Sequence, residues 1–260
     1  MLGALLRHWQ AWRDAHRIAR HAIPDALWQL TLLRYPFLAQ LGAADLAALR
    51  RLSSLFLATK EFHGAAGFVV TDEIAVAVAA QACLPILHLG LQRYDGFVGI
   101  VMHESEVVAR REVTDEDGIV HAYDEELAGE AMEGGPVMLA WQAVASSDDP
   151  ALVGADAVYN VVIHEFAHVL DMQDGIADGV PLLDSPAERE AWMAVIDPAW
   201  EHFCARVDAG EETLIDPYGA EAVEEFFAVA TEAFFIAPKQ MQREEPELFA
   251  LLSGFYRRAP

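Results

Sequence analysis

The chain has 260 residues, of which 54% are hydrophobic, so it can bury a large core as one domain or two. Its net charge of −24 arises beyond residue 60, because residues 1–60 carry +5 and the remaining 200 carry −29. Such an acidic body would repel phosphates, which argues against nucleic acid as a partner. The longest run without Asp, Glu, Lys or Arg, 74–92, is interrupted by Pro85, so no membrane span is predicted.

Residues 1–60 are predicted to be helical and to pack on a body formed by residues 61–260. The clearest helix is 43–59, where Leu46, Leu49, Leu52 and Phe56 recur at helical spacing. A basic stretch over residues 7–21 precedes it. This stretch can be a helix or tail that packs on the acidic body, or it can contact a membrane surface or a partner.

The middle of the chain favours strands. Residues 60–70 look extended, and a helix is expected from Asp72. Alternating residues in 96–112 and the turn at 114–118 predict strands and a hairpin into 119–123. A further strand is expected over 137–144. Together these elements predict an α+β fold with a helical N-terminal part and a small mixed or antiparallel sheet.

Cys83 and Cys204 are the only cysteines and suggest no disulfide framework. The apolar start, residues 1–6, is too short for a secretory signal. A cytoplasmic location is therefore expected.

The most informative motif is H-E-x-x-H at residues 164–168, inside an apolar segment of helical length. His164 and His168 lie one turn apart on the same helix face, so both imidazoles can bind one Zn²⁺. Glu165 would then sit beside the ion and could take a proton from bound water. The alternative is a helix whose histidines merely cap the core.

A third ligand is expected from the apolar segment 221–235. Glu221 and Glu224 suit the solvated first turn of a helix. Glu225 and Glu232 lie deeper, where an acid is costly unless it is paired or bound to metal. The residues alone leave both of these acids open as ligands.

The chain resembles the Mlc titration factor family of zinc peptidases, which are gluzincins similar to the catalytic domain of anthrax lethal factor. The resemblance depends on residues 164–172, on Asp216-Pro217-Tyr218-Gly219, and on 225–229 followed by 232–235. It extends upstream to 79–87 and 127–131. The one departure is Ala128, where the family pattern has Ser before 129–131.

The resemblance implies a zincin-like metallopeptidase with one Zn²⁺ per chain. It implies His164, His168 and Glu225 as ligands, Glu165 as general base, and Tyr218 as a hydroxyl facing the open side of the metal. Tyr218 precedes Glu225 by the family's spacing of seven residues, which favours Glu225 over its neighbours. From sequence alone, Tyr218 could equally be a packing residue.

The expected function is zinc-dependent hydrolysis of a peptide or protein, with aminopeptidase-like action. The alternative is a regulatory protein that binds and sequesters a transcriptional repressor such as Mlc. Asp171 and Glu232 are candidates to orient the ligands, with a turn role as the alternative for Asp171. The resemblance gives strand 137–144 the role of pairing with substrate, although an ordinary core strand also fits. The segment 173–184 is the expected mobile loop.

Overall fold

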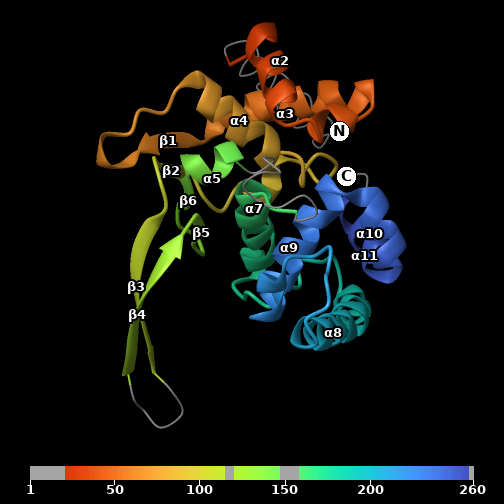
Figure 1. Ribbon diagram of the computed structural model, residues 1–260. Helices are drawn as coiled ribbons and strands as arrows, with labels where there is room; N and C mark the ends of the chain where they lie inside the picture. Colours follow the sequence, from red (N-terminus) through yellow and green to blue (C-terminus); the bar gives the residue numbers. More distant parts are fainter. Residues whose placement is uncertain (1–20, 115–119, 147–157, 258–260) are drawn as a thin grey trace.

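Helices make up most of the part of the chain that the structure describes, and a small sheet lies beside them in the computed structural model (Figure 1). The structure describes residues 21–114, 120–146 and 158–257. The predicted α+β class is confirmed, because one mixed sheet and one antiparallel strand pair accompany the helices. The division into 1–60 and 61–260 stays a prediction, and the basic stretch lies almost entirely outside the described residues.

From residue 21, where the described part of the chain begins, three α-helices come first: α2 (Asp25–Arg34), α3 (Ala43–Thr59) and α4 (Asp72–Ala82). Helix α3 has the bounds that its leucine spacing predicts. Helix α4 is capped by Thr71, whose side chain accepts a hydrogen bond from Ile74 N. It is buried along almost its whole length, because it packs between α2, α3 and the later helix α7.

The main sheet has four strands in the order β1-β2-β6-β5. The first three are parallel to one another, and β5 is antiparallel to β6, with Gly129 opposite Leu139. The strands are β1 (Glu61–Gly64), β2 (Gly99–His103), β5 (Gly129–Ala131) and β6 (Val137–Ala140).

Strand β6 differs in two ways from what was expected of residues 137–144: in its length, and in its role as a strand that pairs with substrate. Strand β6 ends at Ala140, and 141–146 forms helix α5 (Trp141–Ser146) instead. All four residues of β6 are buried, and it lies between β2 and β5. Because both of its edges are already paired, β6 is a core strand. The edge that faces the helices belongs to β5.

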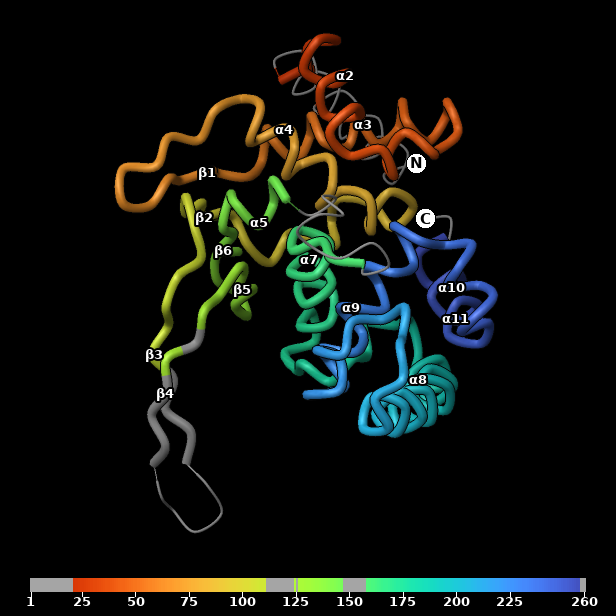
Figure 2. The backbone as a smooth tube through the Cα atoms, in the orientation of Figure 1, coloured from red at the N-terminus to blue at the C-terminus, as the bar shows by residue number. Residues whose placement is uncertain are grey.

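A separate two-stranded hairpin, β3 (Val107–Thr114) and β4 (Val120–Leu127), leaves the body beside the sheet (Figures 1 and 2). The pairing is antiparallel, as the alternating sequence predicts, with Val107 opposite Leu127. Strand β4 leads directly into β5, so the base of the hairpin adjoins the sheet edge.

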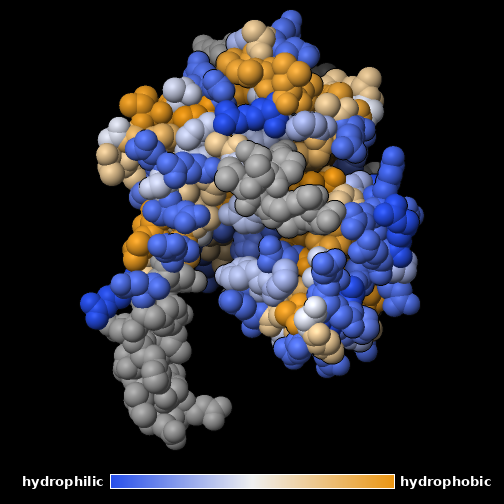
Figure 3. All heavy atoms as spheres, in the orientation of Figure 1, coloured by the Kyte–Doolittle hydropathy of each residue, from blue (hydrophilic) through white to orange (hydrophobic). Residues whose placement is uncertain are grey.

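The C-terminal part is helical. Helix α7 packs against α9 and against strand β5, and the longest helix, α8, contacts both α9 and α11. The helices are α7 (Val161–Asp171), α8 (Pro186–Asp208), α9 (Val223–Ile236), α10 (Pro238–Glu244) and α11 (Pro246–Tyr256). None of the helices within the described ranges combines the length and the apolar character needed to cross a bilayer. The face shown in Figure 3 is largely hydrophilic over α8, α10 and α11.

An aromatic cluster holds α7 against the N-terminal part. The ring of Phe166 lies 5.7 Å from that of Phe56, 5.0 Å from Tyr94 and 5.8 Å from Phe97, between ring centroids. Each such pair contributes about 0.5–1.5 kcal/mol beyond the burial of its area. Phe166 lies between His164 and His168 in sequence, so this packing fixes the helix that carries both.

Candidate active site

Helix α7 begins with a buried polar cap. The Asn160 side chain accepts a hydrogen bond from Ile163 N at 2.9 Å and donates to Gln81 Oε1 of α4 at 2.7 Å. The helix buries its apolar residues on both sides of the H-E-x-x-H motif, while His164 and His168 keep 13% of their side chains exposed. It ends in a turn at Met172–Asp174, where Gly175 adopts a φ of 89° that favours glycine.

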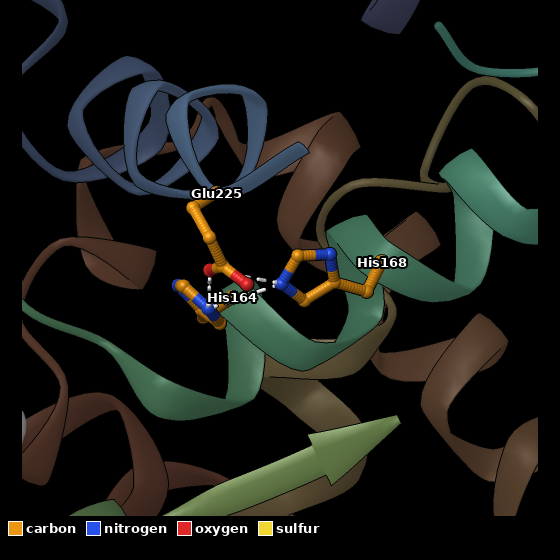
Figure 4. A group of neighbouring side chains, drawn as sticks. All are labelled: His164, His168 and Glu225. Carbon is orange, nitrogen blue, oxygen red and sulfur yellow. Dashed lines mark hydrogen bonds and ion pairs between the residues drawn. The ribbon is translucent and has the colours of Figure 1, made fainter. Parts of the chain in front are cut away.

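Helix α9 supplies the third member of the group. Figure 4 shows Glu225 of α9 and both histidines of α7 pointing toward one another. Glu225 Oε2 lies 3.1 Å from His164 Nε2 and 3.3 Å from His168 Nε2, and the two histidine nitrogens are 3.2 Å apart. Ligands placed tetrahedrally about 2.0–2.1 Å from zinc are separated by about 3.3 Å. The three atoms therefore have the spacing of three corners of one coordination shell.

The donor chemistry also fits a metal ion. Within the described part of the chain, Glu225 Oε2 is buried and takes no well-directed hydrogen bond. Burial by itself would raise the pKa of Glu225, but the facing His164 and His168 outweigh it and lower that pKa to about 2. The carboxylate is thus held ionised and aimed at two imidazoles, which is the arrangement that a divalent cation requires.

Glu165 lies beside this group but outside it. Its carboxylate accepts a hydrogen bond from the backbone of Ala131 in β5. A Cβ built at Gly129 would stand only 2.4 Å from Glu165 Oε1, so the strand can approach this closely only because residue 129 is glycine. Burial raises the pKa of Glu165, and the neighbouring His164 and His168 counteract that rise in part. A buried carboxylate with a raised pKa suits proton transfer near neutral pH.

Tyr218 lies in a short 3-10 turn, η5 (Pro217–Ala220), immediately before α9. Asp216 Oδ1 accepts a hydrogen bond from Tyr218 N at 2.9 Å and sets this turn. The Tyr218 ring centroid is 6.1 Å from that of His164, and 42% of the residue is exposed. The structure thus brings Tyr218 to the solvent side of the group, away from the packed core.

Comparison with known proteins agrees with this geometry. Residues 9–257 match the family described as Glucose-regulated metallo-peptidase M90. The chain belongs to this metallopeptidase family. The chain is 35% identical to "Uncharacterized protein slr2042" of Synechocystis, over 96% of its own length and 89% of that protein.

Two other relatives carry the name Mlc titration factor A. The protein of Cronobacter sakazakii is 32% identical over 96% of the present chain and 91% of its own length. The protein of Serratia proteamaculans is 34% identical over 90% and 88%. The predicted family is therefore confirmed, and a metallopeptidase family implies a metal ion that His164, His168 and Glu225 could hold.

Glu232 contacts His164 at Nδ1, the ring nitrogen that does not face Glu225. Its Oε1 lies 2.9 Å from His164 Nδ1, and its Oε2 accepts a short hydrogen bond from Asn160 N. Burial raises the pKa of Glu232, and the neighbouring His164 counteracts that rise. A carboxylate on Nδ1 leaves Nε2 of the same ring directed at the metal position. This contact is the orienting role expected for Glu232.

Asp171 contacts the loop after α7, although its spacing from His164 suggests that it orients a histidine. It is fully buried, and its Oδ2 accepts a hydrogen bond from Gly179 N at 3.0 Å. Its Oδ1 has no hydrogen-bond partner among the described residues. The hydrogen bonds recorded for Asp171 go to the following loop and not to a histidine, so the alternative role as a turn residue fits better.

The loop after α7, expected to be mobile, is tied down at several points. Besides Asp171, the Trp192 indole donates to Gly179 O at 2.9 Å, and Arg93 Nη1 donates to Leu182 O at 2.9 Å. Arg189 forms a short ion pair with Asp178. These contacts hold the loop to α8 and to Arg93.

Two residues that shape the site had no assigned role in the sequence analysis. Asn160 joins α4, α7 and α9, and an Asn directly before an apolar helix could have been identified as a cap. Gly129 admits β5 to Glu165. No sequence pattern identifies that role, because the two residues meet only when strand and helix pack.

Proposed function

We propose that this protein is a zinc-dependent peptidase in which His164, His168 and Glu225 bind the metal and Glu165 acts as general base. The observation that supports this most directly is the separation of 3.1–3.3 Å among the three donor atoms, which come from two different helices. Membership of a metallopeptidase family supports it independently. A bound zinc ion would lower the pKa of a coordinated water and polarise the carbonyl of a peptide bond.

The chain's own residues would perform the proton transfers. The Glu165 carboxylate accepts a proton from the attacking water and later passes it to the leaving amine. Its contacts with β5 hold it in one position between those two events. Glu232 keeps His164 oriented throughout, because both of its oxygens are engaged.

Tyr218 completes the proposal. Its hydroxyl would donate a hydrogen bond to the oxyanion that forms from the carbonyl. The position of its ring beside His164, on the exposed side, supports this role. Replacement Tyr218→Phe should lower kcat by about 10²–10³, the usual effect of losing one such donor, with KM changed much less. Steady-state kinetics measure this, and an unaltered kcat would remove Tyr218 from the mechanism.

The decisive experiment separates metal binding from turnover. The purified protein should contain about one zinc per chain by mass spectrometry of the elements, and a chelator should stop hydrolysis of peptide substrates. Replacement Glu165→Gln should retain zinc yet lower kcat by about 10²–10⁴, because the base is lost while every ligand stays. His164→Ala should lose zinc. Full activity in Glu165→Gln would contradict the mechanism.

Aminopeptidase-like action and a cytoplasmic location are further parts of the proposal. The location is supported by Cys83 and Cys204, both of which are free thiols. Exopeptidase action is tested by comparing a peptide with its N-acetylated form, which only an endopeptidase should cleave equally well.

The second candidate function is sequestration of a transcriptional repressor. The observation that favours it is the name Mlc titration factor A, borne by relatives at 32–34% identity. Binding of purified Mlc that survives both chelation and Glu165→Gln would support it. Peptide hydrolysis without such binding would favour the peptidase alone.

A further inference from the structure

A pocket of about 220 Å³ opens beside Glu165 at the N-terminal half of α7. We refer to it as the acidic pocket. Its walls come from the junction of β4 and β5, from α7, from η5 and from α9. Its lining includes Glu126, Ala128, Tyr159, Val161, Asp216 and Val229, besides His164 and Glu165.

The acidic pocket carries charge of one sign. Glu126 and Asp216 line it together with Glu165 and Glu232, and its described lining contains no Lys or Arg. The pKa of Tyr159 reflects this negative charge. Burial raises that pKa, and the nearby carboxylates of Glu232, Glu106, Glu165 and Asp216 raise it further. Glu165 and Glu232 are engaged by Ala131, Asn160 and His164. Asp216 Oδ1 accepts a hydrogen bond from Tyr218 N, so the carboxylate oxygens left to meet a ligand are those of Glu126 and Oδ2 of Asp216.

The rest of the lining is apolar. Val161, Val229 and Ala128 contribute aliphatic side chains to the same lining. A lysine or arginine side chain has the matching character, because an aliphatic stem carries its charge several bonds away from the backbone. A glutamate or aspartate side chain would meet repulsion from the same acids.

Strand β5 indicates which substrate residue reaches this pocket. Ala128 O accepts a hydrogen bond from Ala140 N of β6, so the backbone groups of Gly129 and Ala131 point to the opposite edge of β5, where Glu165 already accepts a hydrogen bond from the backbone of Ala131. An extended peptide that pairs antiparallel with this edge runs opposite to β5. Its C-terminal part then lies over residues 126–129, which border the acidic pocket.

We propose that the acidic pocket binds a lysine or arginine side chain on the amine side of the cleaved bond, so that the enzyme prefers cationic residues at that position. This inference rests on the proposed peptidase function. Glu126 and Asp216 are the residues that would determine the specificity, through direct contact with the substrate cation.

The test uses pairs of peptides that differ only at the residue after the cleaved bond, with the cleavage site mapped by mass spectrometry. Lysine is compared with norleucine, and arginine with citrulline, which is nearly isosteric but uncharged. The zinc-loaded enzyme should show kcat/KM about tenfold higher for the charged member of each pair, the usual gain from one charge-assisted hydrogen bond. Raising the salt concentration should shrink this ratio, because the pocket is open to solvent.

Variants assign the preference to the pocket. The double replacement Glu126→Gln and Asp216→Asn should bring the lysine-to-norleucine ratio close to one, while the Asn side chain can still accept the hydrogen bond from Tyr218 N. The matched control is the double replacement Glu190→Gln and Asp197→Asn, at two exposed acids of α8, which removes the same two charges outside the pocket. Circular dichroism and zinc content establish that the variants are folded.

Equal cleavage of lysine and norleucine peptides would overturn the inference. A preference confined to the residue before the cleaved bond would overturn it too, as would a ratio that survives the double replacement. If no peptide is cleaved, the proposed function itself fails. In that case fluorescence anisotropy with Glu165→Gln still decides the inference, because the lysine peptide should bind about tenfold more tightly than the norleucine peptide.

Discussion

The end of α7 and the middle of α9 carry two acids in the same relation to the proposed metal ligands. Asp171 follows His164 by seven residues, and Glu232 follows Glu225 by seven. Glu232 contacts His164 across the helix interface, whereas Asp171 accepts a hydrogen bond from Gly179 N in the next loop. Equal spacing places a residue on the same face of its own helix. The neighbouring element then decides what that residue does.

The difference has a simple physical cause. Glu232 lies well inside α9, where the side chain can only point at the packed neighbour, α7. Asp171 is the last residue of α7, where the chain turns back and presents its own backbone N–H groups. A buried carboxylate takes the nearest donors. For Asp171 these are backbone groups, and for Glu232 they are a histidine and a helix N-terminus.

The largest loss of zinc affinity should follow replacement of Glu225, the proposed metal ligand of α9. Glu232, on the same helix, only supports a ligand. Replacement Glu225→Gln should lower zinc affinity by more than the roughly 10–100-fold typical of an orienting residue, because a charged ligand is lost. Zinc affinity is measured by competition with a chelating dye. The matched control is Glu221→Gln, an exposed acid before α9 that should keep the wild-type affinity. A Glu225→Gln protein that binds zinc normally would contradict the proposed site.

A smaller effect is expected for Glu232→Gln, which keeps the shape but loses the charge that orients His164. Zinc affinity should fall by about 10–100-fold. Asp171→Asn should change it far less, because the hydrogen bonds of Asp171 go to the loop. The same dye competition compares the two variants directly. Equal losses in both would show that the contrast between α7 and α9 is wrong.

The third prediction for this comparison concerns stability and pH. Burial raises the pKa of Asp171 to about 6, although the N–H groups of Gly179 and Asp178 oppose this rise. The folded state therefore binds the proton more tightly than the unfolded state does. The charged form costs the folded state up to about 3 kcal/mol, and this cost appears as the pH rises from about 4 through 6.

Replacement Asp171→Asn removes this titration. The free energy of unfolding of the variant, relative to that of the wild type, should increase as the pH rises from 4 to 7, because only the wild type loses stability when Asp171 ionises. Urea unfolding of the zinc-free proteins at several pH values measures it, and the difference between the two proteins cancels the other titrating groups. A difference that does not depend on pH would show that Asp171 is not a strained buried acid.

Local patterns predicted the elements with the strongest periodicity. Helix α3, the start of α4, the β3–β4 hairpin and the motif helix α7 follow from leucine spacing, caps and alternation. The bounds of β6 were wrong because Val137–Val144 is apolar except for Gln142, and such a run does not show where a strand becomes a helix. The order of strands in the sheet depends on long-range pairing, which no local signal encodes.

For the site, the sequence by itself determined that two imidazoles and a carboxylic acid share one helix, because the spacing of residues 164–168 and the helical period suffice for that. It also narrowed the third ligand to two acids of one apolar helix. Only the tertiary structure decided that Glu225 meets both histidines, that Glu232 supports one of them, and that Gly129 lets an edge strand touch Glu165. Each of those contacts joins residues far apart in the chain, so it exists only once α7, α9 and β5 have packed together.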